Sequence, residues 1–225
     1  MNILVLGKGK TGSLVAEVAR ERGHSVEALD ANENQDGAAL TVERLAKVSV
    51  VIDFTSPEAA VQNVSAVLRA GGRIVVGTTG WYEELAAMRA LVSLHGGALL
   101  YGTNFSIGVQ KLFRLTADLA GLEGYKFTVD ETHHVTKLDA PSGTALTLRE
   151  IILKKQPQAV VEVTSHRIAD AKGEHVVTAT SEEDTIVVSH NAFSRLGFAR
   201  GAVRGAEWLA GKNGAWEFRE VFGEL

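Results

Sequence analysis

The chain has 225 residues, of which 45% are hydrophobic and 22% are charged, ordinary values for a soluble globular protein. No apolar run reaches membrane-spanning length, and the N-terminus does not resemble a signal peptide. The net charge of −4 comes from interspersed acidic and basic residues, so we expect neither nucleic acid nor a membrane surface as a partner. The lack of cysteine excludes disulfides and cysteine-ligated metals. We therefore expect a cytoplasmic protein.

The first thirty residues predict a strand, a glycine turn, a helix and a second strand. Residues 2–6 are a short apolar run typical of a buried parallel strand. Residues 25–29 read as a second strand that finishes at Asp30. The turn after the first strand reads Gly7-Lys8-Gly9-Lys10-Thr11-Gly12. In this order the elements match the dinucleotide-binding fingerprint: the glycines permit a tight turn and close approach of a pyrophosphate, and the acid binds a ribose hydroxyl. The alternative is a plain strand–helix turn.

Strands and helices continue to alternate up to about residue 101. Further strands are predicted over residues 48–54, 73–76 and 98–101, with helices ending near residues 70 and 94. This alternation predicts a doubly wound parallel sheet, on which ligands bind beyond the carboxyl ends of the strands. The turns at that edge supply further cofactor candidates, namely Phe54, Thr55, Gly77, Thr78, Thr79, Asn104 and Phe105.

From residue 106 the pattern indicates a second, α+β domain. A helix is followed by strand-like runs at residues 125–129, 159–165, 175–181 and 185–190, with one helix after Ser142. The last three strands favour a meander of antiparallel or mixed pairing. A final helix and a short aromatic tail should return to the first domain. We therefore assign residues 1–104 and 199–225 to a dinucleotide-binding domain, and residues 105–198 to an inserted substrate-binding domain.

A polar cluster between Glu131 and Ala145 is the candidate site of chemistry. His133 and His134 are adjacent in a strand, so they point to opposite faces, which argues against a metal site; one of them could instead be a core histidine. Lys137 could be an ordinary surface lysine. However, the helix start at Ser142, Gly143 and Thr144 offers free N–H groups to an anion. A lysine and an imidazole beside such a helix start suggest a site that binds carboxylates and donates protons.

The same cluster resembles the signature of the dihydrodipicolinate reductase family of lysine biosynthesis, also called the 4-hydroxy-tetrahydrodipicolinate reductases. The matching segment is Glu131-x-His133-His134-x-x-Lys137-x-Asp139-Ala140-Pro141-Ser142-Gly143-Thr144-Ala145. Residues 51–58, 77–80, 104–109 and 198–203 also resemble the family in the same order, so that the resemblance covers nearly the whole chain.

The resemblance implies a Rossmann-type domain, an inserted substrate-binding and oligomerisation domain, and a homotetramer. It implies hydride transfer from NADH or NADPH to a cyclic dicarboxylate made from aspartate semialdehyde and pyruvate. Carried over by position, His133 and Lys137 are the acid–base pair and His134 a substrate ligand. A substrate carboxylate would bind at Ser142, Gly143 and Thr144. The dinucleotide would bind the glycine loop, Asp30, Phe54-Thr55, Gly77-Thr78-Thr79 and Thr103-Asn104-Phe105.

The chain departs from the family pattern in several places. It is short, its glycine loop is one residue shorter than the usual form, and the segment from Arg167 to His175 is abbreviated. The position after Asp30 is Ala31, where arginine often stands in members that use NADPH. An acid without that arginine favours NADH over NADPH. Two other hypotheses remain at this stage: a non-catalytic NAD(H)-sensing module, and an amino-acid or diaminopimelate dehydrogenase on the same fold.

Overall fold

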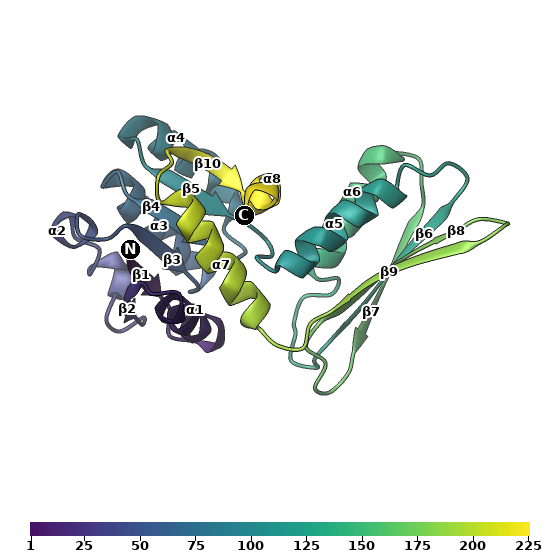
Figure 1. Cartoon of the computed structure of the whole chain (residues 1–225), viewed down its shortest axis with the longest axis horizontal. Helices are drawn as coiled ribbons and strands as arrows, with labels where there is room; N and C mark the ends of the chain where they lie inside the picture. Colours follow the sequence, from purple (N-terminus) through teal and green to yellow (C-terminus); the bar gives the residue numbers. More distant parts are fainter. The chain divides into compact units, whose positions relative to one another are not determined.

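The computed structural model describes residues 1–225 and divides the chain into two compact units. The first unit comprises residues 1–106 and 196–225, and the second comprises residues 107–195. Figure 1 shows the chain coloured from its N-terminus to its C-terminus, with the last helices returning to the first unit. The second unit is therefore an insertion between two segments of the first.

The first unit contains a six-stranded, fully parallel sheet in the order β10-β5-β4-β3-β1-β2. Its strands are β1 (Asn2–Leu6), β2 (Ser25–Leu29), β3 (Val50–Asp53), β4 (Arg73–Val76), β5 (Ala98–Tyr101) and β10 (Gly214–Glu217). The central strands are buried on both faces, as their unbroken apolar sequences predict. From β1 the chain first adds β2 on one side, and it then crosses back to add β3 on the other side of β1. The direction of strand addition therefore reverses here, and a switch point lies between β1 and β3.

Helices cover both faces of this sheet. They are α1 (Lys10–Glu21), α2 (Val42–Leu45), α3 (Pro57–Arg69), α4 (Leu85–His95), α7 (Leu196–Leu209) and α8 (Phe218–Val221), with short 3₁₀ turns at Gln35–Gly37, Tyr82–Glu84 and Phe222–Glu224. Apolar residues of α1 and α7 form one core against the sheet, and those of α3 and α4 form the other. The segment predicted only as an aromatic tail contains a strand, because β10 pairs in parallel with β5.

The second unit is a four-stranded mixed sheet covered on one face by two helices. Its elements are α5 (Ile107–Leu119), β6 (Lys126–His133), α6 (Gly143–Lys155), β7 (Val161–Arg167), β8 (Glu174–Thr180) and β9 (Thr185–Asn191). The strand order is β7-β6-β8-β9, with β6 parallel to β7 and antiparallel to β8. The last three strands are therefore not a consecutive meander, since β6 separates β7 from β8. Apolar residues of α5, α6 and the sheet form the core of this unit.

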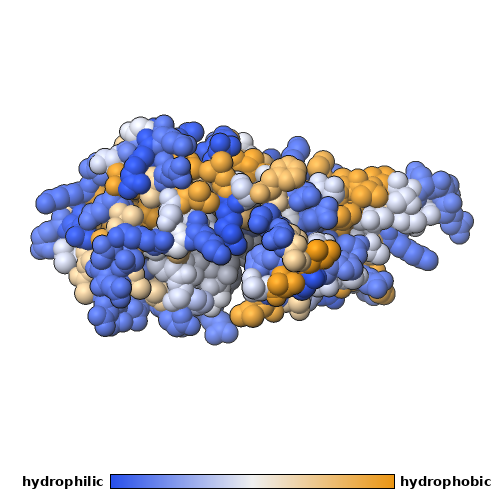
Figure 2. Space-filling view, turned by 90° about the horizontal axis from the view of Figure 1, so that it is seen from below, coloured by the Kyte–Doolittle hydropathy of each residue, from blue (hydrophilic) through white to orange (hydrophobic).

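The arrangement confirms the predicted fold class, a doubly wound parallel sheet with an inserted α+β part. No helix of the chain is both long enough and apolar enough to cross a membrane. Several large apolar side chains are nevertheless exposed on the second unit, and Figure 2 shows hydrophobic residues among hydrophilic ones on the molecular surface. The most exposed are Leu138 at 98%, Val160 at 90% and Phe193 at 87%.

Candidate active site

The first unit has a cavity of about 790 Å³ at the switch point of its sheet. It is lined by the ends of β1, β2 and β3 and by the start of α3, and its volume is in the range of small-molecule and cofactor sites. Six of the predicted cofactor residues line it: Gly7, Lys8, Gly9, Asp30, Phe54 and Thr55. The structure therefore gathers the first half of the glycine loop and the acid around one cavity.

The three glycines of the loop meet different constraints. Gly7 has a φ of +97°, and a Cβ there would lie 2.2 Å from the carbonyl oxygen of Phe54. A Cβ at Gly12 would lie 1.9 Å from the carbonyl oxygen of Gly7, so this glycine allows α1 to approach the strand. A Cβ at Gly9 would meet nothing within 4 Å. Gly9 is also the N-cap of α1 and has no side-chain cap, so the first N–H groups of the helix face an open space that suits a phosphate.

Charged residues surround the acid at the end of β2. The Asp30 carboxylate accepts hydrogen bonds from the backbone N–H groups of Asn32 and Glu33, at 2.9 and 3.1 Å. The Lys8 ammonium pairs closely with the Glu33 carboxylate and lies 4.0 Å from that of Asp30. The hydrogen bond from Lys8 lowers the pKa of Glu33. Glu33 was not predicted as a site residue. Its position three residues after Asp30 is the feature of the sequence that could have indicated it.

The remaining predicted cofactor residues do not line this cavity. Lys10, Thr11 and Gly12 form the first turn of α1, while Gly77, Thr78, Thr79, Thr103, Asn104 and Phe105 follow β4 and β5. The Thr78 hydroxyl donates to the buried carboxylate of Asp53 at 2.6 Å and accepts from the backbone N–H of Thr55 at 2.8 Å. Phe105 is 2% exposed and packs against Phe218. Thr78 thus stabilises the turn after β3 by hydrogen bonds, and Phe105 is a core residue in the turn after β5.

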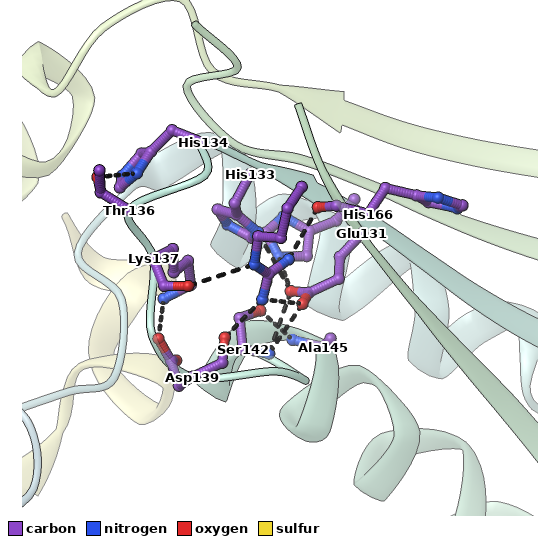
Figure 3. A network of polar contacts seen from close by, with 11 residues as sticks. Glu131, His133, His134, Thr136, Lys137, Asp139, Ser142, Ala145 and His166 are labelled. Carbon is purple, nitrogen blue, oxygen red and sulfur yellow. Dashed lines mark hydrogen bonds and ion pairs between the residues drawn. The ribbon is translucent and has the colours of Figure 1, made fainter. Parts of the chain in front are cut away.

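In the second unit, a polar network converges on the Glu131 carboxylate, which is fully buried. Both of its oxygens accept a hydrogen bond from the backbone N–H of Ser142 at 3.1 Å, and Oε1 also accepts one from the Arg167 guanidinium at 3.2 Å. Burial alone would raise the pKa of this carboxyl, but the bonds from Ser142 and the other donors outweigh burial and hold the pKa below its usual value. Figure 3 shows Glu131, His133 and Ser142 directed toward one another.

His133 is the last residue of β6 and lies inside this network. The residue is 8% exposed, and its Nδ1 lies 3.3 Å from the Glu131 carboxylate. Its Nε2 faces Gly173, where an added Cβ would lie only 3.3 Å away. Burial lowers the pKa of His133, and the charge of Glu131 offsets this only in part. The imidazole is therefore neutral at neutral pH.

His175 on β8 is a member of the network that was not predicted from the sequence. Register pairs it with Glu131 across the antiparallel ladder, and its Nε2 lies 3.2 Å from the Ser142 hydroxyl. Burial, followed by the nearby His133, lowers the pKa of His175 to about 4. Neither His175 nor Arg167 stood out in the sequence, because only the strand order brings them beside Glu131.

The segment between β6 and α6 carries the remaining predicted residues. The Lys137 ammonium donates to the Asp139 carboxylate at 2.6 Å, while His134 Nδ1 lies 2.8 Å from the Thr136 hydroxyl, away from the Glu131 network (Figure 3). The Arg167 guanidinium ties this segment to β7 by donating to the backbone carbonyl of Asp139.

The N-terminus of α6 follows directly. Ser142 caps the helix by accepting from the N–H of Ala145, and Thr144 is 7% exposed. Gly143 is exposed, and a Cβ there would meet nothing within 4 Å. The first turn contains no acidic residue that would repel an anion. This end of α6 therefore suits a carboxylate.

Glu131, His133 and His175 bring their possible ligand atoms within 4.8 Å of one another, a composition that could hold a metal ion. The Arg167 guanidinium and the Ser142 N–H already occupy the carboxylate, and a nearby guanidinium opposes a cation. We therefore interpret the cluster as a hydrogen-bonding network around a histidine, in which proton transfer is the available chemistry.

Comparison with known proteins places the chain in a single family along its length. The family models described as dihydrodipicolinate reductase, N-terminus and C-terminus, match residues 1–105 and 108–222. The 4-hydroxy-tetrahydrodipicolinate reductase of Christiangramia forsetii is 35% identical, with 100% of this chain and 99% of the relative covered. That of Natronomonas pharaonis is also 35% identical, with 96% and 97% covered.

Among solved structures, dipicolinate-bound dihydrodipicolinate reductase from Paenisporosarcina sp. TG-14 superposes with a TM-score of 0.82 at 20% identity, with 100% of this chain and 99% of that chain covered. An amine dehydrogenase from Mycobacterium smegmatis shares the fold at a TM-score of 0.68 and 11% identity, with 97% and 95% covered. The full-length relatives decide against a non-catalytic sensor and against an amino-acid dehydrogenase. The chain belongs to the dihydrodipicolinate reductase family and is an NAD(P)H-dependent oxidoreductase of lysine biosynthesis with 4-hydroxy-tetrahydrodipicolinate reductase activity.

Proposed function

We propose that this reductase holds NADH in the cavity of the first unit, and that His133 and Lys137 of the second unit manage the proton. The observation that supports this assignment most directly is the network of Figure 3, in which a buried neutral imidazole, an ammonium and a helix N-terminus lie on one short segment. When bound, NADH would supply the hydride for one end of a conjugated C=C–C=N system. The residues of the second unit would supply the proton that the adjacent carbon then needs.

The two acid–base groups have different protonation states, which suggests a division of labour. His133 is neutral at neutral pH because burial lowers its pKa, so it is a better proton acceptor than donor in the resting enzyme. Lys137 is paired with Asp139 at the start of the reaction and carries the available proton. We assign proton donation to Lys137. A neutral His133 then serves to orient the substrate, with a lone pair that can accept a hydrogen bond.

The substrate carboxylates would bind at the start of α6. Ser142 caps the helix, Gly143 and Thr144 are its first two residues, and α6 is 13 residues long, enough for a developed helix dipole. His134, whose Nδ1 lies 2.8 Å from the Thr136 hydroxyl, is proposed as a second substrate ligand. The structural neighbour from Paenisporosarcina carries dipicolinate, a cyclic dicarboxylate, which agrees with an occupant of this chemistry here.

Charge at the end of β2 supports NADH over NADPH. A 2′-phosphate beside Asp30 would meet one carboxylate directly and a second from Glu33. Lys8 is the nearby cation, and its pairing with Glu33 leaves less positive charge for a phosphate. A ribose hydroxyl can instead donate to Asp30. The residues after β4 and β5, from Gly77 to Thr79 and from Thr103 to Phe105, are proposed to border the same dinucleotide.

Kinetics with the cyclic substrate test these assignments. We expect Lys137→Ala to lower kcat by roughly 10²–10⁴-fold, which is the usual contribution of a positioned proton donor. Lys111→Ala, at an exposed lysine on α5, is the matched control and should keep normal turnover. Near-normal turnover of Lys137→Ala would remove this lysine from the mechanism. A higher kcat/KM with NADPH than with NADH in the wild-type enzyme would refute the cofactor preference.

We also propose a homotetramer built through the uncovered face of the second unit's sheet. Residues that point away from α5 and α6 are mostly uncharged, as with Thr185, Val187 and Ser189 on β9. Val187, a large apolar residue, is 56% exposed on this face. An exposed apolar sheet face of this kind favours contact with another subunit. Light scattering after size-exclusion chromatography measures the mass directly. A monomer for the wild type, or an unchanged tetramer for Val187→Lys, would refute this proposal.

A further inference from the structure

We infer that Glu131 is the positioning residue of the active site: its buried carboxylate holds the Nδ1 proton of His133 and, through Ser142, the N-terminus of α6. This inference rests on the proposed role of His133. Glu131 itself reaches neither substrate nor cofactor, because its side chain is fully buried. It acts by fixing two groups that do.

The first step concerns which nitrogen of His133 carries the proton. Nδ1 is buried and has no hydrogen-bonding partner of good geometry, and the nearest acceptor is Glu131 Oε2 at 3.3 Å. The Arg167 guanidinium binds the other oxygen, Oε1, while Oε2 accepts from the Ser142 N–H and has a lone pair left for a second donor. A buried nitrogen without a partner costs free energy, so Nδ1 is expected to be protonated and turned toward Oε2. Nε2 then carries the free lone pair.

The second step concerns where that lone pair points. Nε2 faces Gly173, whose φ of +136° and missing side chain leave room beside the ring. A methyl group there would approach Nε2 to 3.3 Å. Nε2 is thus the nitrogen available for a substrate or for Lys137. With the other tautomer, the available nitrogen would carry a hydrogen and could not accept a proton.

The third step connects the same carboxylate to anion binding. The Ser142 N–H donates to both oxygens of Glu131, and the Ser142 hydroxyl caps α6. The direction of the first turn of α6 is therefore set by Glu131 as well as by the helix itself. Loss of the carboxylate should affect both acid–base chemistry and substrate binding, whereas loss of the Ser142 hydroxyl should affect binding alone.

Other charged groups also face His133 and must be considered in any pH measurement. Lys137 and Asp139 approach from the following segment, Arg167 from β7, and His175 from β8 with a ring-centroid distance of 5.0 Å. Glu131 and Asp139 raise the pKa of His133, while Lys137 and Arg167 lower it. Replacing Glu131 by the neutral Gln therefore leaves the cations without their main counter-charge and lowers the pKa of His133 further.

The experiment compares Glu131→Gln with Asp118→Asn, an exposed acid near the end of α5. Asp118→Asn should match the wild type. For Glu131→Gln we expect kcat to fall roughly 10²-fold and KM for the substrate to rise. In the pH profile of kcat/KM, the limb that reports the ionisation of His133 should move to lower pH by about one unit. The dissociation constant for NADH should be unchanged. Ser142→Ala should raise KM without moving the pH profile.

His133→Gln separates this inference from the proposed function. If His133→Gln is slow but Glu131→Gln has a normal kcat and an unshifted pH profile, the role of Glu131 alone is overturned. Normal turnover of both would overturn the role of His133 as well. If Glu131→Gln fails to fold, ¹⁵N NMR of the wild-type imidazoles decides, with His133→Gln assigning the signal. We expect the Nδ1–H tautomer for His133, and the Nε2–H tautomer would overturn the inference.

Discussion

Replacing His175 by Gln should make the stability of the second unit less sensitive to acid. His175 is 4% exposed, and burial together with the nearby His133 lowers its pKa to about 4. The imidazole is therefore neutral in the folded protein down to moderately acidic pH. In the unfolded chain the same ring takes up a proton near pH ~6.5. Acid thus favours the unfolded state through this residue, and the Gln variant lacks the effect.

The size of the effect follows from the two pKa values. The folded pKa is depressed, so the stabilisation is complete above pH ~6.5 and is lost as the pH falls through the folded pKa of about 4. The difference of about 2.5 pH units corresponds to roughly 3 kcal/mol in total. At about pH 4.5 most of it, about 2.5 kcal/mol, has already been lost relative to neutral pH. A Gln side chain does not titrate, so it contributes nothing to this dependence of the unfolding free energy on pH.

Urea unfolding at neutral pH and at about pH 4.5, for the wild type and the variant, measures the difference. Trp81, Trp208 and Trp216 all lie in the first unit, so tryptophan fluorescence follows that unit while far-UV circular dichroism follows both. His166→Gln, on strand β7 of the same sheet, is the matched control because this imidazole is exposed. It should retain the wild-type pH dependence.

The reasoning would be refuted if His175→Gln lost as much stability between the two pH values as the wild type. It would also be refuted if His166→Gln removed the pH dependence equally well. A lower stability of His175→Gln at neutral pH does not bear on the test, because the prediction concerns the difference between two pH values for each protein.

Three further predictions concern other parts of the molecule. Glu33→Gln should raise the ratio of kcat/KM with NADPH to kcat/KM with NADH, because Lys8 loses its partner and can pair with a 2′-phosphate. The expected rise is roughly two- to fivefold, which corresponds to the free energy of an exposed ion pair. An unchanged or lower ratio contradicts the prediction. Gly173→Ala should lower kcat with little change in NADH affinity, since its Cβ would crowd His133 Nε2 at 3.3 Å, and steady-state kinetics with a binding titration check this. Asp53→Ala should destabilise the first unit by about 3 kcal/mol, because several buried donors lose their acceptor; tryptophan-detected unfolding measures it.

The parallel sheet was predictable because its signals are local. The strands β1, β3, β4 and β5 are mainly apolar runs bounded by turn residues, and the glycine loop lies between the first strand and its helix. The strand β10 was not predicted, since Gly214–Glu217 has only four residues, all partly exposed, and becomes a strand only by pairing with β5. Short edge strands of this kind depend on tertiary contacts more than on their own sequence.

The candidate site divides in the same way. Glu131, His133, Lys137 and Ser142 lie close together in the sequence, and their residue types suggest proton transfer beside an anion site. His175 and Arg167 reach the same network from β8 and β7 through the strand order β7-β6-β8-β9. An alternation pattern does not specify which strands become neighbours. Predicting these two partners would have required the pairing of β6 with both β7 and β8.

The position of Glu131 is difficult to explain by stability alone. Its neighbours along the inward face of β6, Val129 and Phe127, are fully or nearly fully buried apolar residues. Apolar side chains in place of a buried ion pair are often neutral or even stabilising, since desolvation of two charges offsets much of their attraction. A sheet that needed only a core would therefore gain little from a carboxylate at this position. The carboxylate becomes necessary once His133 must present a defined nitrogen and α6 must point its first turn in a defined direction, because no apolar side chain can accept either hydrogen bond.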